Sequence, residues 1–306
     1  MLHDCAVCRQ RTDSGSAATE RFIDDQITWP APYRTAVNIV FNYQGNEAAN
    51  TRVGSNGRVD YETYTEQEYG RTKGIARVLR VLRERDVKAT FTICGAIAEH
   101  YPDTVLAIAA DGHEIAGHGY HHEIATNLPK EQEREIFQTT LGLLRQLTGA
   151  PVTGWRSCHQ SPHTPELVLE EGLKYNSNSF ITDLPYLLTM GDRTGVEVVR
   201  QPYGDMRTYG RSGFGGDPDV AFAIWRSTFD SLHAESVDAP VYVPYSLHPF
   251  ISGRPGRSDA LAKLIDHIQG RDGVWLSTSD EVATAVLASA SHPAGEPATP
   301  RETVDA

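Results

Sequence analysis

Short apolar segments alternate with segments of helical periodicity along most of this chain of 306 residues. The clearest apolar segment is 35–43 (TAVNIVFNY), whose β-branched and aromatic residues are typical of a buried strand. Residues 69–85 follow it, with apolar side chains at helical spacing. The same pattern predicts further strands at 88–94, 113–118, 152–158, 241–247 and 274–277, and further helices at 102–111, 129–148, 164–171 and 258–269. This alternation indicates an α/β fold, in which helices cover a parallel sheet.

Polar and ionisable side chains gather where the predicted strands end. They are Asn42, Gln44, His118, His122, Arg156 and His248. In a closed parallel barrel, residues at the carboxyl ends of the strands form the active site. We therefore predict that these six residues line one mouth of a single barrel.

The composition narrows the classes of function. A net charge of −12 argues against a surface for nucleic acid or anionic membrane, which would need a clustered basic patch. No apolar run approaches the about 20 residues of a membrane-spanning helix, and the first residues lack the apolar centre of a signal peptide. The sequence therefore predicts a cytoplasmic protein that acts on a small molecule. It leaves open whether the chain forms a homo-oligomer.

The two ends of the chain differ from its central part. Residues 1–28 are polar and are expected to form an irregular N-terminal extension. Residues 289–306 are rich in Pro, Ala and charge and are expected to form a disordered tail. Because no linker or repeat divides residues 29–288, we predict a single domain there.

Two histidines, His118 and His122, stand in the segment GHEIAGHGYHHE just past a predicted strand. Imidazoles on such a loop can converge on one divalent ion, and Zn²⁺ is the usual choice. The alternative is a polar loop whose histidines are satisfied by hydrogen bonds. Their spacing alone does not decide between the two.

Several motifs follow one another through residues 29–285. They are WPAPYRTAVNIVFNY, EYGRTKGIARVLRVL, KATFTICGAIAEHYPDTVLAIAADGHEIAGHGYHHE, GWRSCHQSPHTPELVLEEGLKYNSNSF, DLPY at 183–186 and LHPFISGRPGR at 247–257. Together they resemble the polysaccharide deacetylase (NodB-homology) family, in the branch with peptidoglycan-deacetylase-like, cyclic-imide-hydrolase-like and allantoinase-like members. The resemblance implies a distorted (β/α) barrel of the NodB type. It also implies hydrolysis of a non-peptide carbon–nitrogen bond in an amide, an N-acyl group or a cyclic imide or ureide.

The resemblance assigns roles to individual residues. In this family an Asp and two His hold a metal, a neighbouring Asp is the general base, an Arg orients that base, and a late His is the general acid. On this chain the resemblance places the metal histidines at His118 and His122. It places the arginine at Arg156 and the late histidine at His248.

The first family motif is altered in this chain. Where the branch usually has Asp-x-Asp, this chain has Asn42-Tyr43-Gln44. An amide cannot accept a proton near neutral pH, so neither Asn42 nor Gln44 can be a general base. The carbonyl oxygen of Gln44 can still face a metal, although it is a weak ligand for Zn²⁺. We therefore expect zinc or another divalent metal to be held weakly, with a metal-independent site, as in the allantoinase-like members, as the alternative.

Residues beside these motifs are candidates for the missing chemistry. His159 is a candidate replacement base, metal ligand or substrate-binding residue, and Cys158 is a candidate nucleophile or a buried strand cysteine. Because adjacent residues on a strand point to opposite faces, these two side chains are not expected to touch. Glu47 and Glu123 are candidate bases or ordinary loop carboxylates.

Further residues are candidates for substrate contact. Arg254 and Arg257 either clamp a substrate carboxylate or pair with surface acids. Tyr43 and Trp155 either line the pocket or pack in the core, as aromatic residues at strand ends commonly do.

Two classes of function fit these residues. The first is a hydrolase in which His248 protonates the departing nitrogen. The second is a binding protein, or a protein with changed chemistry in a specialised biosynthetic pathway, because the two amides remove both acidic roles. The presence together of His118, His122, Arg156 and His248 favours the hydrolase.

Overall fold

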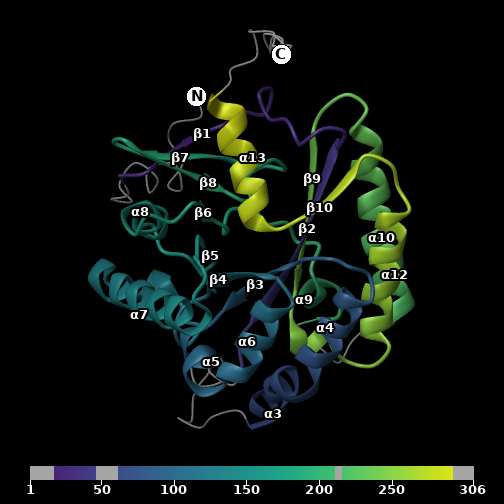
Figure 1. Ribbon diagram of the computed structural model, residues 1–306, viewed down its shortest axis with the longest axis horizontal. Helices are drawn as coiled ribbons and strands as arrows, with labels where there is room; N and C mark the ends of the chain where they lie inside the picture. Colours follow the sequence, from purple (N-terminus) through teal and green to yellow (C-terminus); the bar gives the residue numbers. More distant parts are fainter. Residues whose placement is uncertain (1–16, 46–60, 211–215, 292–306) are drawn as a thin grey trace, which may run out of the picture.

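A ten-stranded sheet organises the computed structural model of the protein, which describes residues 17–45, 61–210 and 216–291 (Figure 1). The strands are β1 (Thr19–Arg21), β2 (Thr35–Tyr43), β3 (Thr90–Ile93), β4 (Glu114–Gly117), β5 (Gly154–Trp155), β6 (Tyr175–Asn176), β7 (Tyr186–Met190), β8 (Arg193–Glu197), β9 (Val241–Leu247) and β10 (Val274–Ser277). The helices are α3 (Tyr61–Tyr69), α4 (Ile75–Arg83), α5 (Gly95–His100), α6 (Pro102–Ala110), α7 (Lys130–Thr148), α8 (Thr164–Glu170), α9 (Asp205–Thr208), α10 (Pro218–Glu235), α11 (Pro249–Ser252), α12 (Arg257–Gln269) and α13 (Ser279–Ser291). A π-helical segment (Gly70–Gly74) joins α3 to α4, and a 3₁₀ turn (Ala125–Asn127) precedes α7.

Strand β2 lies at the centre of this sheet. Along one edge it pairs with β9, and along the other it pairs first with β10 and then with β3, all in parallel. Strands β4, β5, β6 and β8 continue the parallel order. Strand β7 then pairs antiparallel with β8, and β1 pairs antiparallel with β7. The predicted α/β fold with a parallel sheet is confirmed. Because the strands run the same way, the carboxyl ends of β2, β4, β5, β8 and β9 lie on one edge of the sheet.

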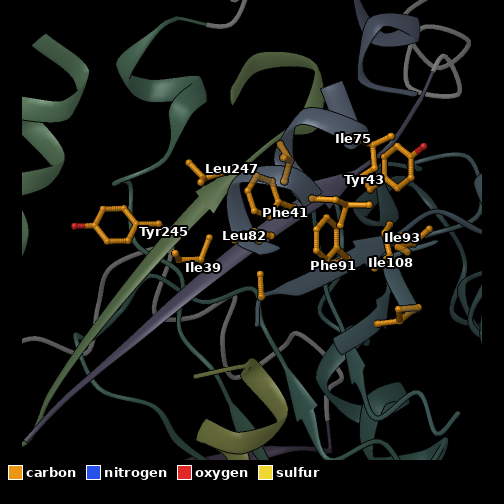
Figure 2. Packing of buried hydrophobic residues seen from close by; sticks show 14 of the residues in the cluster. Ile39, Phe41, Tyr43, Ile75, Leu82, Phe91, Ile93, Ile108, Tyr245 and Leu247 are labelled. Atoms are coloured by element: carbon orange, nitrogen blue, oxygen red, sulfur yellow. The ribbon is translucent and has the colours of Figure 1, made fainter. Parts of the chain in front are cut away.

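The side chains on the two faces of β2 lie in different surroundings. All nine of its residues are buried, and successive side chains point to opposite faces of the sheet. Ile39, Phe41 and Tyr43 belong to the hydrophobic core that the helices cover, and Figure 2 shows them packed with Ile75 and Phe91. Asn42 therefore lies on the opposite face from this core.

Helices cover the outer side of the sheet. Helices α10 and α12 pack side by side along one flank, and α7 lies on the other side of the molecule (Figure 1). Phe137 of α7 stacks on Trp155 of β5, with ring centroids 3.7 Å apart. The packing of α7 on β5 fixes the strand end that carries Arg156.

The helix expected over 69–85 is divided into α3, the π-helical segment and α4. Gly70 and Gly74 are buried against the segment that follows β9. A Cβ atom on Gly74 would lie 2.2 Å from the carbonyl oxygen of Pro249. The backbone of α11 therefore approaches this π-helical segment closely at Pro249, the residue just after His248.

Strand β5 is shorter than the strand predicted over 152–158. Only Gly154 and Trp155 pair with their neighbours, and the chain bends at Cys158. A Cβ atom on Gly154 would lie 1.9 Å from the ring of Tyr175. The pairing of β5 with β6 therefore requires glycine at this position.

The expectation of irregular structure up to residue 28 is wrong for part of that segment. Residues 19–21 form β1 and pair with β7, and Ile23 and Ile27 are buried. Helix α13 also continues to Ser291, past the expected end of the domain at residue 288. Residues 1–16 and 292–306 lie outside the described residues. Within the described part of the chain, no helix combines the length and apolar character needed to cross a membrane.

Gly117, at the end of β4, tests the packing beneath the site. A Cβ atom there would lie 2.3 Å from the ring of Trp155, which is 2% exposed and has no room to move away from Phe137. Gly117→Ala should therefore lower the free energy of unfolding by about 1–3 kcal/mol in urea denaturation. Gly142→Ala in α7 is the control, because nothing lies within 4 Å of the added atom; it should be neutral or stabilising by up to about 1 kcal/mol. Equal losses in the two variants would contradict this account of the packing.

Candidate active site

The predicted site residues do meet at the carboxyl edge of the sheet. Asn42 ends β2, His118 follows β4, Arg156 follows β5 and His248 follows β9. Direct contacts join Asn42 to Arg156 and to His248, and His118 to the backbone of Arg156. All four residues are less than 7% exposed, so the site is a buried polar cluster at the end of the strands.

The side-chain amide of Asn42 is held from two sides. Its Oδ1 accepts hydrogen bonds from Thr92 Oγ1 at 3.0 Å and from Arg156 Nη1 at 3.4 Å. Its Nδ2 therefore points to the Nε2 atom of His248, 3.4 Å away. Because the amide nitrogen only donates, it meets His248 at a ring nitrogen that carries a lone pair.

Arg156 holds this cluster together without a carboxylate partner. Its guanidinium group donates to Ser246 Oγ at 2.9 Å, to Ser177 Oγ at 2.7 Å and to the carbonyl oxygen of Ser177 at 3.2 Å. Burial, and secondarily the charge of Arg200, lowers the pKa of Arg156. Arg156 is thus a cation surrounded by neutral acceptors, and it positions Asn42.

Asp205, which the sequence analysis missed, orients His248. Its Oδ1 accepts from His248 Nδ1 at 2.8 Å, and its Oδ2 accepts from the backbone N–H of His248 at 2.7 Å and from Ser252 Oγ at 2.8 Å. Asp205 is fully buried at the start of α9. Gly204 allows this approach, since a Cβ atom there would lie 2.1 Å from the carbonyl oxygen of Ser246. The only signal in the sequence was an acid after glycine in the segment PYGD, between two strands.

His118 and His122 lie side by side, with ring centroids 4.9 Å apart. The Nδ1 atom of His118 lies 2.6 Å from the carbonyl oxygen of Arg156, so this nitrogen carries the proton. The Nε2 atom of His118 is buried and has no hydrogen-bond partner among the described residues. Burial, and then the nearby charge of His122, lowers the pKa of His118 well below its usual range. His118 is therefore a neutral imidazole with an unused lone pair.

His122 occupies an unusual backbone conformation. Its φ of 59° lies in the left-handed region, which costs a residue other than glycine about 1 kcal/mol or more. The carboxylate of Glu123 supports this turn by accepting from the backbone N–H groups of Tyr120 and His121. Glu123 is thus a loop-stabilising residue, and the strained turn brings His122 beside His118.

These residues match a metal site only in part. His118 directs its free lone pair as a metal-binding histidine does, with its other nitrogen bound to a carbonyl. The carbonyl oxygen of Gln44 is also buried without a hydrogen-bond partner in the described part of the chain. However, no group of three or more His, Cys, Asp or Glu side chains within residues 17–45, 61–210 and 216–291 could hold a metal ion. Two imidazoles and one amide supply no negative charge to a divalent ion.

Tyr43 and Trp155, for which the sequence left pocket lining and core packing open, are core residues. Tyr43 is fully buried on the core face of β2, and its hydroxyl donates to Thr104 of α6 at 3.1 Å (Figure 2). Trp155 is buried against α7 and donates to Ser157 Oγ at 3.0 Å. The alternation of β2 explains the position of Tyr43, because Asn42 and Tyr43 cannot face the same side.

The two arginines predicted to clamp a carboxylate have aromatic partners. The guanidinium carbon of Arg254 lies 4.3 Å from the ring centroid of Tyr69, and that of Arg257 lies 4.3 Å from the ring centroid of Tyr209. Arg254 also donates to the carbonyl oxygen of Phe250 at 3.0 Å. Both guanidinium groups are therefore packed against aromatic rings near α11.

The expectation that Cys158 and His159 do not touch is wrong. The Sγ atom of Cys158 lies 3.2 Å from the Nδ1 atom of His159. The strict alternation of a strand does not apply, because the chain bends at Cys158. His159 is exposed, and its backbone forms a bridge with Ile124. Glu47, the remaining candidate base, lies outside the described residues.

Comparisons with known proteins place this geometry in a family. The polysaccharide deacetylase family profile matches residues 63–168. A Mycobacterium smegmatis structure assigned as a polysaccharide deacetylase is 30% identical, with a TM-score of 0.78, over 86% of this chain and 93% of its own. The chain belongs to the polysaccharide deacetylase family. An allantoinase structure is similar to this family member, with 26% identity and a TM-score of 0.78 over 88% of this chain and 94% of its own. The peptidoglycan deacetylase of Helicobacter pylori is 27% identical over 70% of this chain and 84% of its own length.

The family predicted from the motifs is confirmed, and so is the NodB type of the α/β fold. This polysaccharide deacetylase family member is a hydrolase of carbon–nitrogen bonds other than peptide bonds. The amides at Asn42 and Gln44 then raise the question of which groups carry out the hydrolysis.

Zinc content tests the role of the missing carboxylate. Gln44 follows β2 at the edge of the sheet where His118 follows β4, so an anionic oxygen at this position in Gln44→Asp should raise the zinc retained after dialysis by about tenfold. Elemental analysis of the dialysed protein measures this. Gln146→Asp, at an exposed position near the C-terminal end of α7, adds the same charge at a different place and should leave the zinc content unchanged. Equal zinc in the wild type and in Gln44→Asp would argue against a metal site at these histidines.

Proposed function

We propose that the protein hydrolyses an amide or ureide carbon–nitrogen bond of a small molecule, with His248 as general base and then general acid. The observation that carries this proposal is the chain of contacts from Asp205 through His248 to Asn42. The carboxylate of Asp205 accepts a hydrogen bond from Nδ1 of His248, and the Nδ2 amide of Asn42 donates toward Nε2. His248 is thus held with an unprotonated Nε2 facing the site, which is the state that a general base requires.

The reaction follows from this orientation. His248 Nε2 takes a proton from a water molecule as the water oxygen attacks the carbonyl carbon. Asp205 stabilises the imidazolium that forms, as the acid of a Ser-His-Asp triad does. The proton on Nε2 then passes to the nitrogen, and the carbon–nitrogen bond breaks to leave a carboxyl group and an amine.

Asn42 has a different task from the carboxylate usual in this family. It cannot remove a proton, but its Nδ2 hydrogens can donate to an oxygen of the reacting group. Arg156 and Thr92 hold the amide in this orientation through its Oδ1. An ion bound by His118 and His122 would polarise the carbonyl group. The likeness to an allantoinase and to a peptidoglycan deacetylase supports a carbon–nitrogen bond as the target.

Removing His248 should abolish most of the activity. We expect His248→Ala to lower kcat/KM by about a hundredfold or more, because both proton transfers pass through Nε2. The assay follows release of amine or ammonia from a panel of N-acyl and ureido compounds, on whichever compound the wild type turns over. His100→Ala is the control, since this side chain is 58% exposed and lies at the end of α5. Full activity in His248→Ala would remove His248 from the mechanism.

Asn42→Asp separates changed chemistry from simple loss of the family's base. A carboxylate beside Nε2 would favour the protonated form of His248, so turnover of the native substrate should fall by about tenfold or more near neutral pH. If the protein were instead a degraded deacetylase, the restored acid would raise amide hydrolysis. Kinetics of Asn42→Asp beside Gln146→Asp, which adds the same charge at an exposed position of α7, distinguish the two. Unchanged turnover in both Asn42→Asp and His248→Ala would exclude this site as the active centre.

A further inference from the structure

Two arginines at the carboxyl edge of the sheet differ in what their guanidinium groups contact. Arg156 is 1% exposed, and its guanidinium hydrogen bonds go to Ser177, Ser246 and Asn42. Arg200 is half-buried, and its side chain makes no hydrogen bond or ion pair with any described residue. Its Nε atom is nevertheless buried. Arg156 is thus fully engaged in positioning, whereas the donors of Arg200 remain available.

The backbone places Arg200 at the same edge as the reacting groups. Strand β8 runs parallel to β6, and Arg200 follows β8 by three residues. Its backbone N–H donates to the carbonyl oxygen of Ser179 at 2.8 Å, and Arg156 binds Ser177 in the same segment. The two cations are near enough for the charge of Arg200 to lower the pKa of Arg156, after burial, and of His118.

No carboxylate forms an ion pair with either arginine within residues 17–45, 61–210 and 216–291. Glu197 is the nearest buried acid, but it accepts from Asn176 Nδ2 at 2.6 Å and from the backbone N–H groups of Asn178 and Ser179. Burial raises the pKa of Glu197. Asp205 is bound to His248. The charge of Glu197 acts on both arginines, and Asp205 adds a second carboxylate, yet neither acid forms an ion pair with Arg200. Leaving a buried cation without a direct partner is costly.

We propose that Arg200 binds a carboxylate of the substrate, so that the enzyme acts on anionic amides or ureides. The action on anionic amides or ureides rests on the proposed function, whereas carboxylate binding by Arg200 does not. A guanidinium group offers paired N–H donors that match the two oxygens of a carboxylate. The ring of Phe180, 5.2 Å from the guanidinium carbon, packs against one face of the group and leaves its edge to a ligand. Arg200 thus takes the role that the sequence had suggested for Arg254 and Arg257.

The test compares each acid with its neutral amide. The probes are N-carbamoylglycine and N-acetylglycine, each beside its primary amide, titrated by calorimetry at low ionic strength. The wild type should bind each acid about tenfold or more tightly than the matching amide. Arg200→Gln should reduce this preference to about one, and Arg200→Lys, which keeps the charge but not the paired donors, should retain part of it. Thermal unfolding of each variant verifies that it is folded.

Arg193→Gln is the matched control, because Arg193 lies at the opposite end of β8 and is exposed. It should keep the full preference for the acid. A wild type that binds neither acid, or that prefers neither acid over its amide, overturns the proposal. The proposal is also overturned if Arg200→Gln keeps the preference for the acid and changes the reactivity of Cys158 toward iodoacetamide. Arg200 would then act on the Cys158 thiol and not on a substrate carboxylate.

Carboxylate binding and hydrolysis are tested by separate measurements, so the failure of one proposal can be told from the failure of the other. Acid binding that depends on Arg200, without hydrolysis of any ureido or N-acyl compound, would support the carboxylate site and contradict the proposed function. Hydrolysis that depends on His248 but is equal for acids and amides would support the proposed function and overturn this inference.

Discussion

The structure depends on the pairing of β2 with three other strands. Its nine buried residues join β9 on one edge and β10 and β3 on the other. Because side chains alternate, this one strand supplies Phe41 and Tyr43 to the core and Asn42 to the candidate site. The position of Asn42 relative to His248 at the end of β9 is therefore set by backbone hydrogen bonds between adjacent strands. A change in the register of β2 would disturb the core and the site together.

Much of the fold could be predicted from local patterns. Residues 35–43 and 241–247 form strands with the predicted bounds, because their apolar runs end at a turn. The site residues at strand ends were found for the same reason, since parallel strands bring distant ends together. Asp205 was missed because its role depends on a contact with His248 that is 43 residues away in the chain. The contact of Cys158 with His159 was missed because a bend, invisible in the pattern, ends β5 early.

Electrostatics separates this site from one built around two carboxylates. Arg156 is surrounded by the neutral oxygens of Ser177, Ser246 and Asn42. An Asp at position 42 would form an ion pair with Arg156 and share a proton with His248. The amide keeps the shape of that group and removes its charge. The site has therefore exchanged a fixed anion for a pair of amide donors, which changes the substrates that it can stabilise more than it changes its geometry.

The π-helical segment between α3 and α4 ties the active site to a distant helix. A π turn contains one residue more than an α turn, so it shifts the helical phase by about 100°. Here the shift directs the bare backbone of Gly74 at Pro249, the residue after His248. The extra residue of this turn thus places Gly74 against the backbone next to His248. A regular helix over the same residues would have a different phase and would turn Gly74 away from Pro249, so the backbone next to His248 depends on the phase of a helix that lies outside the sheet.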